Sequence, residues 1–250
     1  MTGALLAAAA GDAETAGRLA AAGVDVLVAY HSSVLRSRGL PSVAGLLPWA
    51  NANELTLGIV SEVVAASAGR PVLATVCAND QLRPPDQVVA QLARHGVAGV
   101  LNAPTTALLT GPVRAAVDSA GLGFDREAEL MSLARAHGLA PWGYACTPAQ
   151  ASALARHGAE AVVAHLGITK AGPVTARHVT TLAGIAAAAR AARPGVLLLA
   201  HGGPLTEPAA LRDCGQDDCG FFGASVFERA ADLDTAVSAW RYALTPDGER

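Results

Sequence analysis

Residues 158–165 read Gly-Ala-Glu-Ala-Val-Val-Ala-His, and residues 195–201 read Gly-Val-Leu-Leu-Leu-Ala-His. Each stretch opens with a glycine turn signal, continues as an apolar run and ends in a histidine. Continuous apolar runs of this length are typical of strands buried on both faces, as in parallel sheets. The two stretches therefore predict two parallel strands, each with a histidine at its end.

Six further apolar runs fit the same pattern, and helical patterns separate them. The predicted strands are Ala4–Ala10, Val24–Tyr30, Val72–Val76, Ala98–Asn102, Ala140–Ala145, Ala161–His165, Val196–Ala200 and Gly220–Ser225. The predicted helices are Asp12–Ala22, Asn53–Ser67, Pro84–His95, Arg126–His137, Thr147–His157, Thr175–Ala192, Glu207–Asp213 and Asp232–Ala243, with Asn53 as the expected N-cap of the second. Eight strand–helix units in 250 residues predict an α/β fold with a single (β/α)8 TIM-barrel domain over residues 1–250. The structural alternative is a doubly wound open sheet, but Gly11-Asp12-Ala13-Glu14 is not the glycine-rich loop that would support it.

The composition excludes several classes of protein. Net charge is −3 and charged residues make up only 16%, so there is no basic field for a nucleic-acid partner. No apolar run approaches the length of a membrane span, and no basic segment precedes the run Ala4–Ala10, so we expect a cytoplasmic protein. Cys214 and Cys219 have the spacing of half a zinc site, but no second Cys or His pair lies nearby in the sequence, and we expect reduced thiols.

The chemistry of such a barrel lies at the carboxyl ends of its strands, so polar residues directly after the apolar runs are candidates. His165 and His201 should be neighbours there, able to bind a metal, move a proton or polarise a carbonyl. The alternative is a hydrogen-bonded structural pair. Asp80, after Val72–Val76, is the candidate general base or metal ligand. The candidate catalytic residues are therefore His165, His201 and Asp80, and the other strand ends add Tyr30, Ser32, Asn102 and Thr105 as candidate substrate-binding residues.

The loops after the last two predicted strands contain glycines. Barrels often hold a phosphate in these two loops, because glycine lets backbone N–H groups approach an anion closely. The alternative is simple turn geometry. The candidate anion-binding residues are Gly202, Gly203, Gly223, Ala224 and Ser225.

The remaining histidines and the lone lysine have less specific signals. His95, His137 and His157 each precede a glycine at a helix end, where a partly cationic imidazole suits the helix dipole, whereas the sequence leaves His31 and His178 undecided. Glu228 and Arg229 are expected to pair with each other. Lys170 is the only lysine. An aldolase using it as a Schiff-base nucleophile is an alternative function, but its place five residues beyond His165 favours a loop cation.

Seven motifs occur in order along the chain and resemble a known family. They are Tyr30-His31-Ser32-Ser33, Ala44-Gly45-Leu46-Leu47-Pro48, Asn51-Ala52-Asn53, Gly99-Val100-Leu101-Asn102-Ala103-Pro104-Thr105, His165-Leu166-Gly167-Ile168-Thr169, His201-Gly202-Gly203-Pro204 and Gly220-Phe221-Phe222-Gly223-Ala224-Ser225. The chain resembles the phosphoenolpyruvate hydrolase-like TIM-barrel family, which includes the barrel domain of a plant tobamovirus-resistance protein. The family's strand-end residues correspond here to Tyr30, Ser32, Asn102, His165, His201 and Ser225.

The resemblance implies a barrel akin to phosphoenolpyruvate mutase and isocitrate lyase. It implies a hydrolase or lyase of a small 2-oxo or enol acid, either phosphoenolpyruvate- or phosphonopyruvate-like or cleaved at a C–C bond by hydrolysis. It further implies a small anionic substrate, Mg²⁺ as the candidate cofactor with no organic cofactor, and a homo-oligomer. Two departures are His31, where the family tends to have asparagine, and Asn79-Asp80, where the mutase group has paired acids. The rival function is a non-catalytic binding or regulatory barrel.

Overall fold

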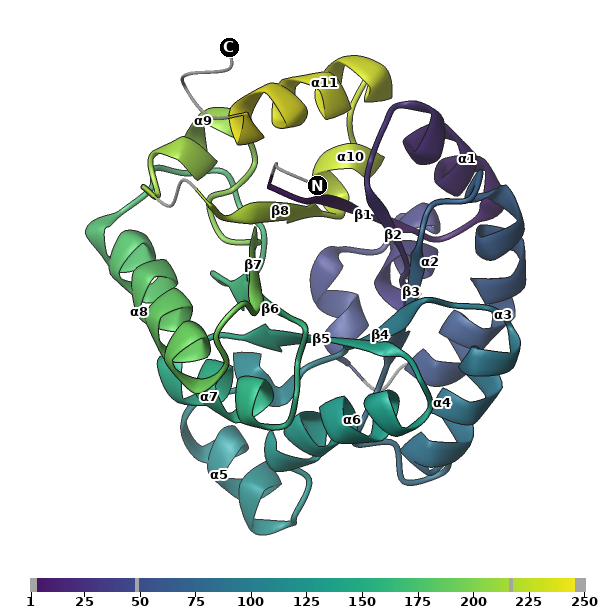
Figure 1. The fold of residues 1–250 in the computed structure, drawn as a ribbon, viewed down its shortest axis with the longest axis vertical. Helices are drawn as coiled ribbons and strands as arrows, with labels where there is room; N and C mark the ends of the chain where they lie inside the picture. Colours follow the sequence, from purple (N-terminus) through teal and green to yellow (C-terminus); the bar gives the residue numbers. More distant parts are fainter. Residues whose placement is uncertain (1–3, 48–49, 216–217, 246–250) are drawn as a thin grey trace.

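The structure, a computed structural model, describes residues 4–47, 50–215 and 218–245. Its eight described strands are all parallel and close into a barrel in chain order, with β1 paired to both β2 and β8 (Figure 1). The strands are β1 (Leu6–Ala10), β2 (Val26–Ala29), β3 (Val72–Val76), β4 (Gly99–Asn102), β5 (Ala140–Ala145), β6 (Ala161–His165), β7 (Leu197–His201) and β8 (Gly220–Gly223). The predicted (β/α)8 barrel is confirmed. Pro48, the last residue of one quoted motif, lies outside the described residues.

The helices surround the barrel as an outer ring (Figure 1). They are α1 (Ala13–Ala21), α2 (His31–Ser37), α3 (Ala52–Ala66), α4 (Pro85–Arg94), α5 (Gly111–Ser119), α6 (Asp125–Ala136), α7 (Pro148–Arg156), α8 (Ala176–Ala192), α9 (Pro208–Arg212), α10 (Ser225–Glu228) and α11 (Leu233–Leu244), with 3-10 turns η1 (Ser42–Leu46) and η2 (Thr106–Leu108). No helix within the described ranges is long and apolar enough to cross a membrane.

Buried side chains form two layers, one inside the barrel and one between strands and helices. β1 shows the alternation: Ala7 and Ala9 belong to the inner cluster, whereas Leu6 and its alternate neighbours pack against the helices. Since β1 contributes only methyl groups to the interior, larger side chains from other strands fill it. Valine and leucine side chains contribute to this filling, and the largest interior residues are the aromatic Tyr30, Trp142, Tyr144 and Phe222. Two of these rings, Tyr30 and Tyr144, reach the carboxyl end.

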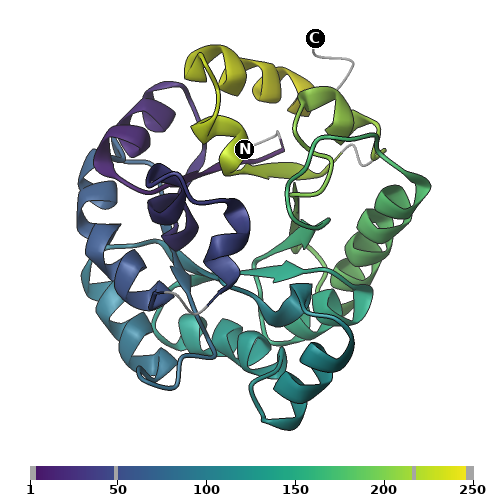
Figure 2. The same cartoon turned by 180° about the vertical axis from the view of Figure 1, so that it is seen from behind.

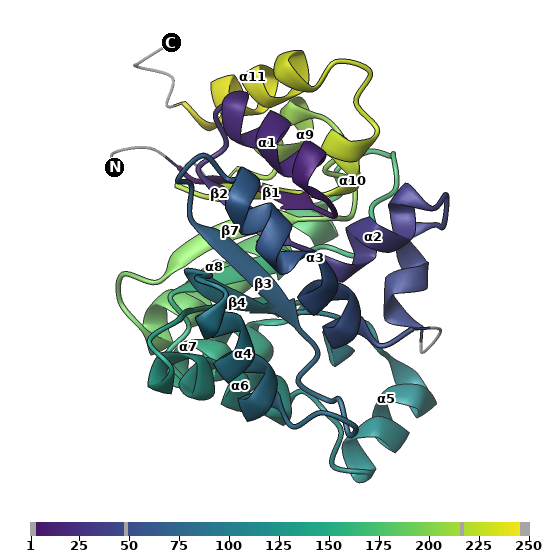
Figure 3. The same cartoon turned by 90° about the vertical axis from the view of Figure 1, so that its right-hand side faces the viewer.

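Five short helical segments follow strand ends where the sequence predicted loops or strand. Figure 3 shows α2 and α5 at one end of the barrel, and Figure 2 shows that end face-on. α2 begins directly after Tyr30 without a side-chain cap, and its buried residues include His31, Ser32 and Ser33. Burial by neighbouring elements, rather than a helix signal in the sequence, therefore produces α2. Similarly, β8 ends at Gly223 and Ser225 opens α10, although the strand was expected to reach Ser225.

Side-chain caps fix several helix starts near their predicted positions. Asp12 and Thr147 accept backbone hydrogen bonds at the starts of α1 and α7, as N-cap residues commonly do. The predicted N-cap of α3 is wrong: Asn51 caps that helix by accepting from the amide of Glu54, and Asn53 lies inside its first turn. Asn53 is thereby free to bond elsewhere, and its contacts reach the loop after β3.

Candidate active site at the barrel mouth

A small cavity of about 40 Å³ opens at the carboxyl end of the barrel. A water molecule needs about 10–15 Å³ on this measure, so the cavity has room for a few heavy atoms. It is lined by Tyr30, His31, Ser32, Arg36, Ser42, Gly45, Leu46, Ala103, Pro104, Thr105, Leu108, Tyr144, His165, Ile168, Thr169, His201, Ala224 and Ser225. We call it the mouth cavity. Of the candidates from sequence, it brings together Tyr30, Ser32, Thr105, His165, His201, Ala224 and Ser225.

The two strand-end histidines are direct neighbours, as predicted. His165 and His201 are paired in the register of β6 and β7, and their ring centroids lie 4.8 Å apart. The hydrogen bonds of their Nδ1 atoms assign opposite tautomers. His201 Nδ1 lies 2.8 Å from the carbonyl oxygen of Phe222 and must donate, whereas His165 Nδ1 accepts from the amide of Gly167 at 3.2 Å. At Nε2, His165 therefore carries a proton to donate and His201 presents a lone pair.

Both imidazoles are uncharged at neutral pH. Burial lowers the pKa of His165 well below its ordinary value, and the neighbouring His201 lowers it further. Burial lowers the pKa of His201 to about 4, with the nearby Arg36 cation adding to the effect and the hydrogen bond to Phe222 opposing it. A neutral pair with one free N–H and one free lone pair can hold an oxygen atom and accept a proton at adjacent positions.

Arg36 and Tyr144 are mouth residues that sequence reasoning did not select. The Arg36 guanidinium lies 5.5 Å from the centre of the Tyr30 ring, and its Nε and Nη2 atoms donate to Glu228. The expected Glu228–Arg229 pair is therefore wrong, because Glu228 pairs with Arg36 across 192 residues. Tyr144 lies between the two histidines and Phe222, with ring centroids 5.0 Å from His165 and 5.2 Å from His201. A polar aromatic residue at a strand end was the available signal for Tyr144.

The Tyr144 hydroxyl is buried and has no hydrogen-bond partner among the described residues. Burial raises the pKa of this phenol well above its ordinary value, and the neighbouring Tyr30 side chain raises it further, so the hydroxyl stays protonated and remains a donor. Buried polar groups are almost always paired, and an unpaired one calls for an explanation. Because Tyr144 lines the mouth cavity, a bound molecule can supply the missing partner.

Gly202, Gly203 and Gly223 lie beside the mouth cavity but do not line it. The Gly203 amide donates to the carbonyl of Gly167 at 2.8 Å, which ties the loop after β7 to the loop after β6. Gly202 and Gly203 have φ angles of 73° and 56°, and a Cβ on Gly203 would lie 2.7 Å from the Leu166 carbonyl oxygen. The approach of two loops therefore requires these glycines, and the Gly203 amide is already occupied.

Asn102 is fully buried and holds a buried carboxylate rather than facing the cavity. Its Nδ2 donates to Glu127 at 2.5 Å, and its Oδ1 accepts from the Tyr144 amide at 2.5 Å. Glu127 also accepts from the Thr105 hydroxyl and from the amide and hydroxyl of Thr106. Burial raises the Glu127 pKa, and these hydrogen bonds oppose the shift without cancelling it. This network fixes the loop after β4 against β5.

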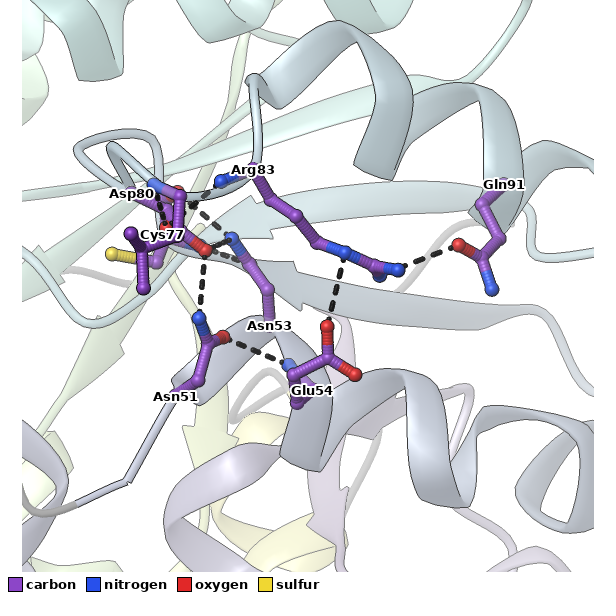
Figure 4. A network of polar contacts seen from close by, with 8 residues as sticks. Asn51, Asn53, Glu54, Cys77, Asp80, Arg83 and Gln91 are labelled. Atoms are coloured by element: carbon purple, nitrogen blue, oxygen red, sulfur yellow. Dashed lines mark hydrogen bonds and ion pairs between the residues drawn. The ribbon is translucent and has the colours of Figure 1, made fainter.

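Asp80 likewise accepts four hydrogen bonds, and it lies outside the mouth cavity (Figure 4). Its Oδ2 accepts from the side chains of Asn51 and Asn53 at 3.1 and 3.0 Å, and its Oδ1 accepts from the Leu82 and Arg83 amides. Partial burial raises its pKa, but these bonds together outweigh burial and leave the pKa below its ordinary value. Asp80 joins the start of α3 to the loop after β3. It lines a second cavity, which adjoins the mouth cavity because His31 and Pro104 line both.

The remaining histidines are structural. His31 is buried, its Nε2 donates to the Gly45 carbonyl at 3.1 Å, and burial lowers its pKa to about 4. It therefore holds η1 beside the mouth cavity. The predicted end positions of His95, His137 and His157 are confirmed, since these residues are the C-caps of α4, α6 and α7. His178 forms a capping box with Thr175 at the start of α8.

A Mg²⁺ site requires carboxylate oxygens that are free to bind the ion. Within the part of the chain that the structure describes, no cluster of three or more His, Cys, Asp or Glu residues could hold a metal ion. Asp80 and Glu127, which lie near the ends of β3 and β4, each accept four hydrogen bonds, which fills the acceptor capacity of a carboxylate, and Glu228 is paired with Arg36. The described residues thus do not fit a Mg²⁺ site.

The two residues considered for other chemistry lie elsewhere. Lys170 is exposed and does not line the mouth cavity, so it lacks the buried position in a pocket that a Schiff-base lysine needs. Cys214 and Cys219 are buried free thiols, and burial raises the pKa of both. Neither position adds a group to the mouth cavity.

Solved structures with the same fold include enzymes of phosphonate and enolpyruvate chemistry. Phosphonopyruvate hydrolase in complex with oxalate and Mg²⁺ superposes with a TM-score of 0.59 at 14% identity, covering 96% of this chain and 80% of that one. Phosphoenolpyruvate phosphomutase from Streptomyces platensis subsp. rosaceus gives a TM-score of 0.59 at 15% identity, covering 96% and 91%. At these identities the likeness establishes the barrel alone.

Curated relatives are longer than this chain. The tomato (Solanum lycopersicum) ToMV resistance protein Tm-1(GCR237) is 37% identical over 231 residues, which cover 88% of this chain and 30% of the relative. The putative transcriptional regulatory protein y4pA of Sinorhizobium fredii is 28% identical over 249 residues, covering 95% of this chain and 41% of that protein. The family model described as phosphoenolpyruvate hydrolase-like matches residues 1–240. The chain therefore belongs to the phosphoenolpyruvate hydrolase-like family.

Proposed function

We propose that this barrel is a hydrolase or lyase of a small 2-oxo or enol acid, with the mouth cavity as its active site. The observation that carries the proposal is the neutral pair of His165 and His201, which present a proton and a lone pair side by side. The family match and the fold of the phosphonopyruvate hydrolase and phosphomutase structures support the same class of reaction. A small anionic substrate and a homo-oligomer belong to this proposal as predictions.

The two imidazoles divide the work of such a reaction. In a hydrolase, His201 Nε2 takes a proton from a water molecule, and the water oxygen forms the new bond as the scissile bond breaks. In a lyase, His201 Nε2 takes the proton from a substrate hydroxyl, and that oxygen becomes a carbonyl as the scissile bond breaks. The electron pair of that bond passes into the 2-oxo group and leaves an enolate. The N–H at His165 Nε2 stabilises the enolate oxygen, which is the main electrostatic task. The His201 imidazolium then returns its proton to the enolate carbon.

Turnover of a panel of small 2-oxo acids, together with deuterium exchange of the pyruvate methyl group followed by NMR, tests the proposal. His201→Ala is expected to lower either rate by about 10²- to 10⁴-fold, the usual contribution of a general base, and His165→Ala should have a comparable effect. The matched control is His95→Ala, which removes a half-buried helix-end histidine, outside the mouth cavity, whose Nδ1 bonds Ser61. Full rates in both mouth variants, with the fold intact, would overturn the proposal.

One observation favours the rival function, a non-catalytic binding barrel. Exposed apolar side chains occur on the loops at the mouth end, with Leu40, Val43 and Leu47 on or beside η1 and Ile168 on the loop after β6. Exposed apolar patches on a monomer commonly mark interaction surfaces. A binding function would survive the loss of His165 and His201, so the same two variants separate the two functions.

A further inference from the structure

We infer that the mouth cavity selects a monocarboxylate without a phosphoryl group, with the carboxylate on Arg36 and the adjacent carbonyl oxygen on the Tyr144 hydroxyl. This inference rests on the proposed function for the site and names its substrate class. It departs from the phosphorylated acid that the family description suggests. Three features lead to it: a partly compensated cation, an unpaired phenol, and loop glycines that serve loop contacts and packing instead of lining the cavity.

Arg36 is the only Lys or Arg residue in the lining of the mouth cavity, within the described part of the chain. Its side chain is 8% exposed and is clamped on one edge, where Nε and Nη2 donate to Glu228 and Nη2 also donates to Ser33. Nη1 has no partner among the described residues. A guanidinium held by its far edge presents its remaining N–H groups in a fixed direction, which suits recognition of a carboxylate oxygen.

Glu228 also limits the charge that the site can accept. It neutralises much of the Arg36 charge, and the two histidines in the cavity are uncharged at neutral pH. A single bound carboxylate matches the remaining positive potential. A phosphate or phosphonate dianion would bring a second negative charge into a buried site that has no second cation, and an uncompensated buried charge is costly.

Tyr144 supplies the second recognition element. Its unpaired hydroxyl stays protonated and lies in the ring cluster that contains both histidines. A donor at this place is satisfied by a carbonyl or enolate oxygen of the ligand. The orphaned donor therefore points to an oxygen next to the carboxylate, as in a 2-oxo acid, rather than to an apolar ligand.

The loops that were expected to bind phosphate are built differently. Gly202, Gly203 and Gly223 are absent from the cavity lining, and the Gly203 amide bonds Gly167 instead of facing a ligand. A Cβ on Gly223 would meet the Phe227 ring at 2.2 Å, so packing accounts for that glycine. Of the five anion-binding candidates only Ala224 and Ser225 line the cavity, so the three glycines themselves provide no cradle for a phosphate.

Ligand binding measured by calorimetry tests the inference without turnover. Four probes are used. Oxamate is an isostere of pyruvate that cannot form an enol, and methyl pyruvate is the uncharged ester of pyruvate. The other two probes are phosphonoacetate and inorganic phosphate. Oxamate is expected to bind at least about 10-fold more tightly than each of the other three, the effect of one charge-assisted hydrogen bond. Tighter binding of phosphonoacetate or phosphate than of oxamate, or no binding of oxamate, overturns the inference.

Variants place the ligand on the two residues. Tyr144→Phe removes a hydroxyl that has no partner, so it should fold normally and weaken oxamate binding by about 10-fold. Arg36→Gln combined with Glu228→Gln removes the buried pair together, so neither charge is left alone, and should weaken oxamate binding by about 10- to 100-fold. Arg190→Gln combined with Asp218→Asn, an ion pair outside the lining of the mouth cavity, is the matched control. Unchanged oxamate affinity in both test variants overturns the inference.

The outcomes separate this inference from the proposed function. If oxamate binding depends on Arg36 and Tyr144 while the histidine variants keep full turnover, the inference stands and the assigned chemistry fails. If instead a phosphorylated acid is turned over with strict dependence on His201 and binds better than oxamate, the chemistry stands and the inference is wrong.

Discussion

Two sets of polar groups at the carboxyl end of the barrel contrast sharply in how their hydrogen bonds are used. Asp80 and Glu127, after β3 and β4, each accept four hydrogen bonds and hold loops in place. On the next strands, β5 to β7, the Nε2 atoms of His165 and His201 and the Tyr144 hydroxyl have no hydrogen-bond partner among the described residues. Satisfied carboxylates stabilise the scaffold, whereas unsatisfied imidazole and phenol groups can act on a ligand.

The largest effect is expected from a substitution at Glu127, the fully buried carboxylate that accepts four hydrogen bonds. Glu127→Gln places an amide N–H₂ against groups that also donate, among them the Thr106 amide, which cannot turn away. We expect the free energy of unfolding to fall by about 3 kcal/mol. Urea denaturation measures the change.

The control for Glu127 is on the same helix. Glu129→Gln, at an exposed position two residues further along α6, should change stability by less than about 0.5 kcal/mol. Equal effects of the two substitutions would show that the buried hydrogen bonds of Glu127 do not add to the stability of the fold.

Acid should destabilise the fold through its buried histidines. His31 and His201 have a pKa of about 4 in the folded state, against about 6.5 in an unfolded chain. Between these values the unfolded state binds protons that the folded state does not, so stability falls as pH decreases from about 6.5, and the contribution of these two residues levels off below about 4. His165, whose pKa is also lowered by burial, adds to the loss of stability in the same direction. Each histidine contributes up to about 3 kcal/mol, and Glu127, whose pKa is raised, opposes them.

Urea denaturation across this pH range measures the slope. His201→Asn should reduce the slope of the unfolding free energy against pH by the equivalent of about one bound proton, because the variant lacks one of the buried imidazoles. A slope that is the same in the variant and the parent would mean that His201 does not stay neutral in the folded protein.

Asp80→Asn tests whether the second saturated carboxylate belongs to the scaffold or to the chemistry. The amide cannot accept all four hydrogen bonds, so stability should fall by about 1–2 kcal/mol, with turnover unchanged. Thermal unfolding and turnover are measured together, with Glu62→Gln on exposed α3 surface as the control. A large loss of turnover at unchanged stability would instead place Asp80 in the chemistry.

The smallest expected effect is a gain in stability at Tyr144, whose hydroxyl has no hydrogen-bond partner among the described residues. Tyr144→Phe deletes a buried hydroxyl without a partner, so the free energy of unfolding should rise by about 1 kcal/mol. Tyr242→Phe, at an exposed position on α11, serves as the reference. A loss of stability in Tyr144→Phe would reveal that the hydroxyl is bonded in the free protein.

Local patterns explain why much of the architecture was predictable. Apolar runs with glycine stops mark each strand, and the register of parallel neighbours then brings His165 beside His201. The segments that the sequence missed, such as α2 and α10, lack capping signals and form because neighbouring elements bury them. Candidate residues chosen by position alone divided in the same way: Ser32 and Ser225 line the cavity, whereas Asn102 and Gly203 turn to loop contacts.

The sequence by itself determined the barrel and the carboxyl end as the place for chemistry, because periodicity and strand ends are local properties of the chain. Only the tertiary structure decided which polar groups stay available. The partners that occupy Asp80 come from as far as 29 residues away, and Glu228 reaches Arg36 across 192 residues. Hydrogen-bond saturation depends on such distant partners, and so it separates the carboxylates that hold loops from the histidines, Arg36 and Tyr144 that face the cavity.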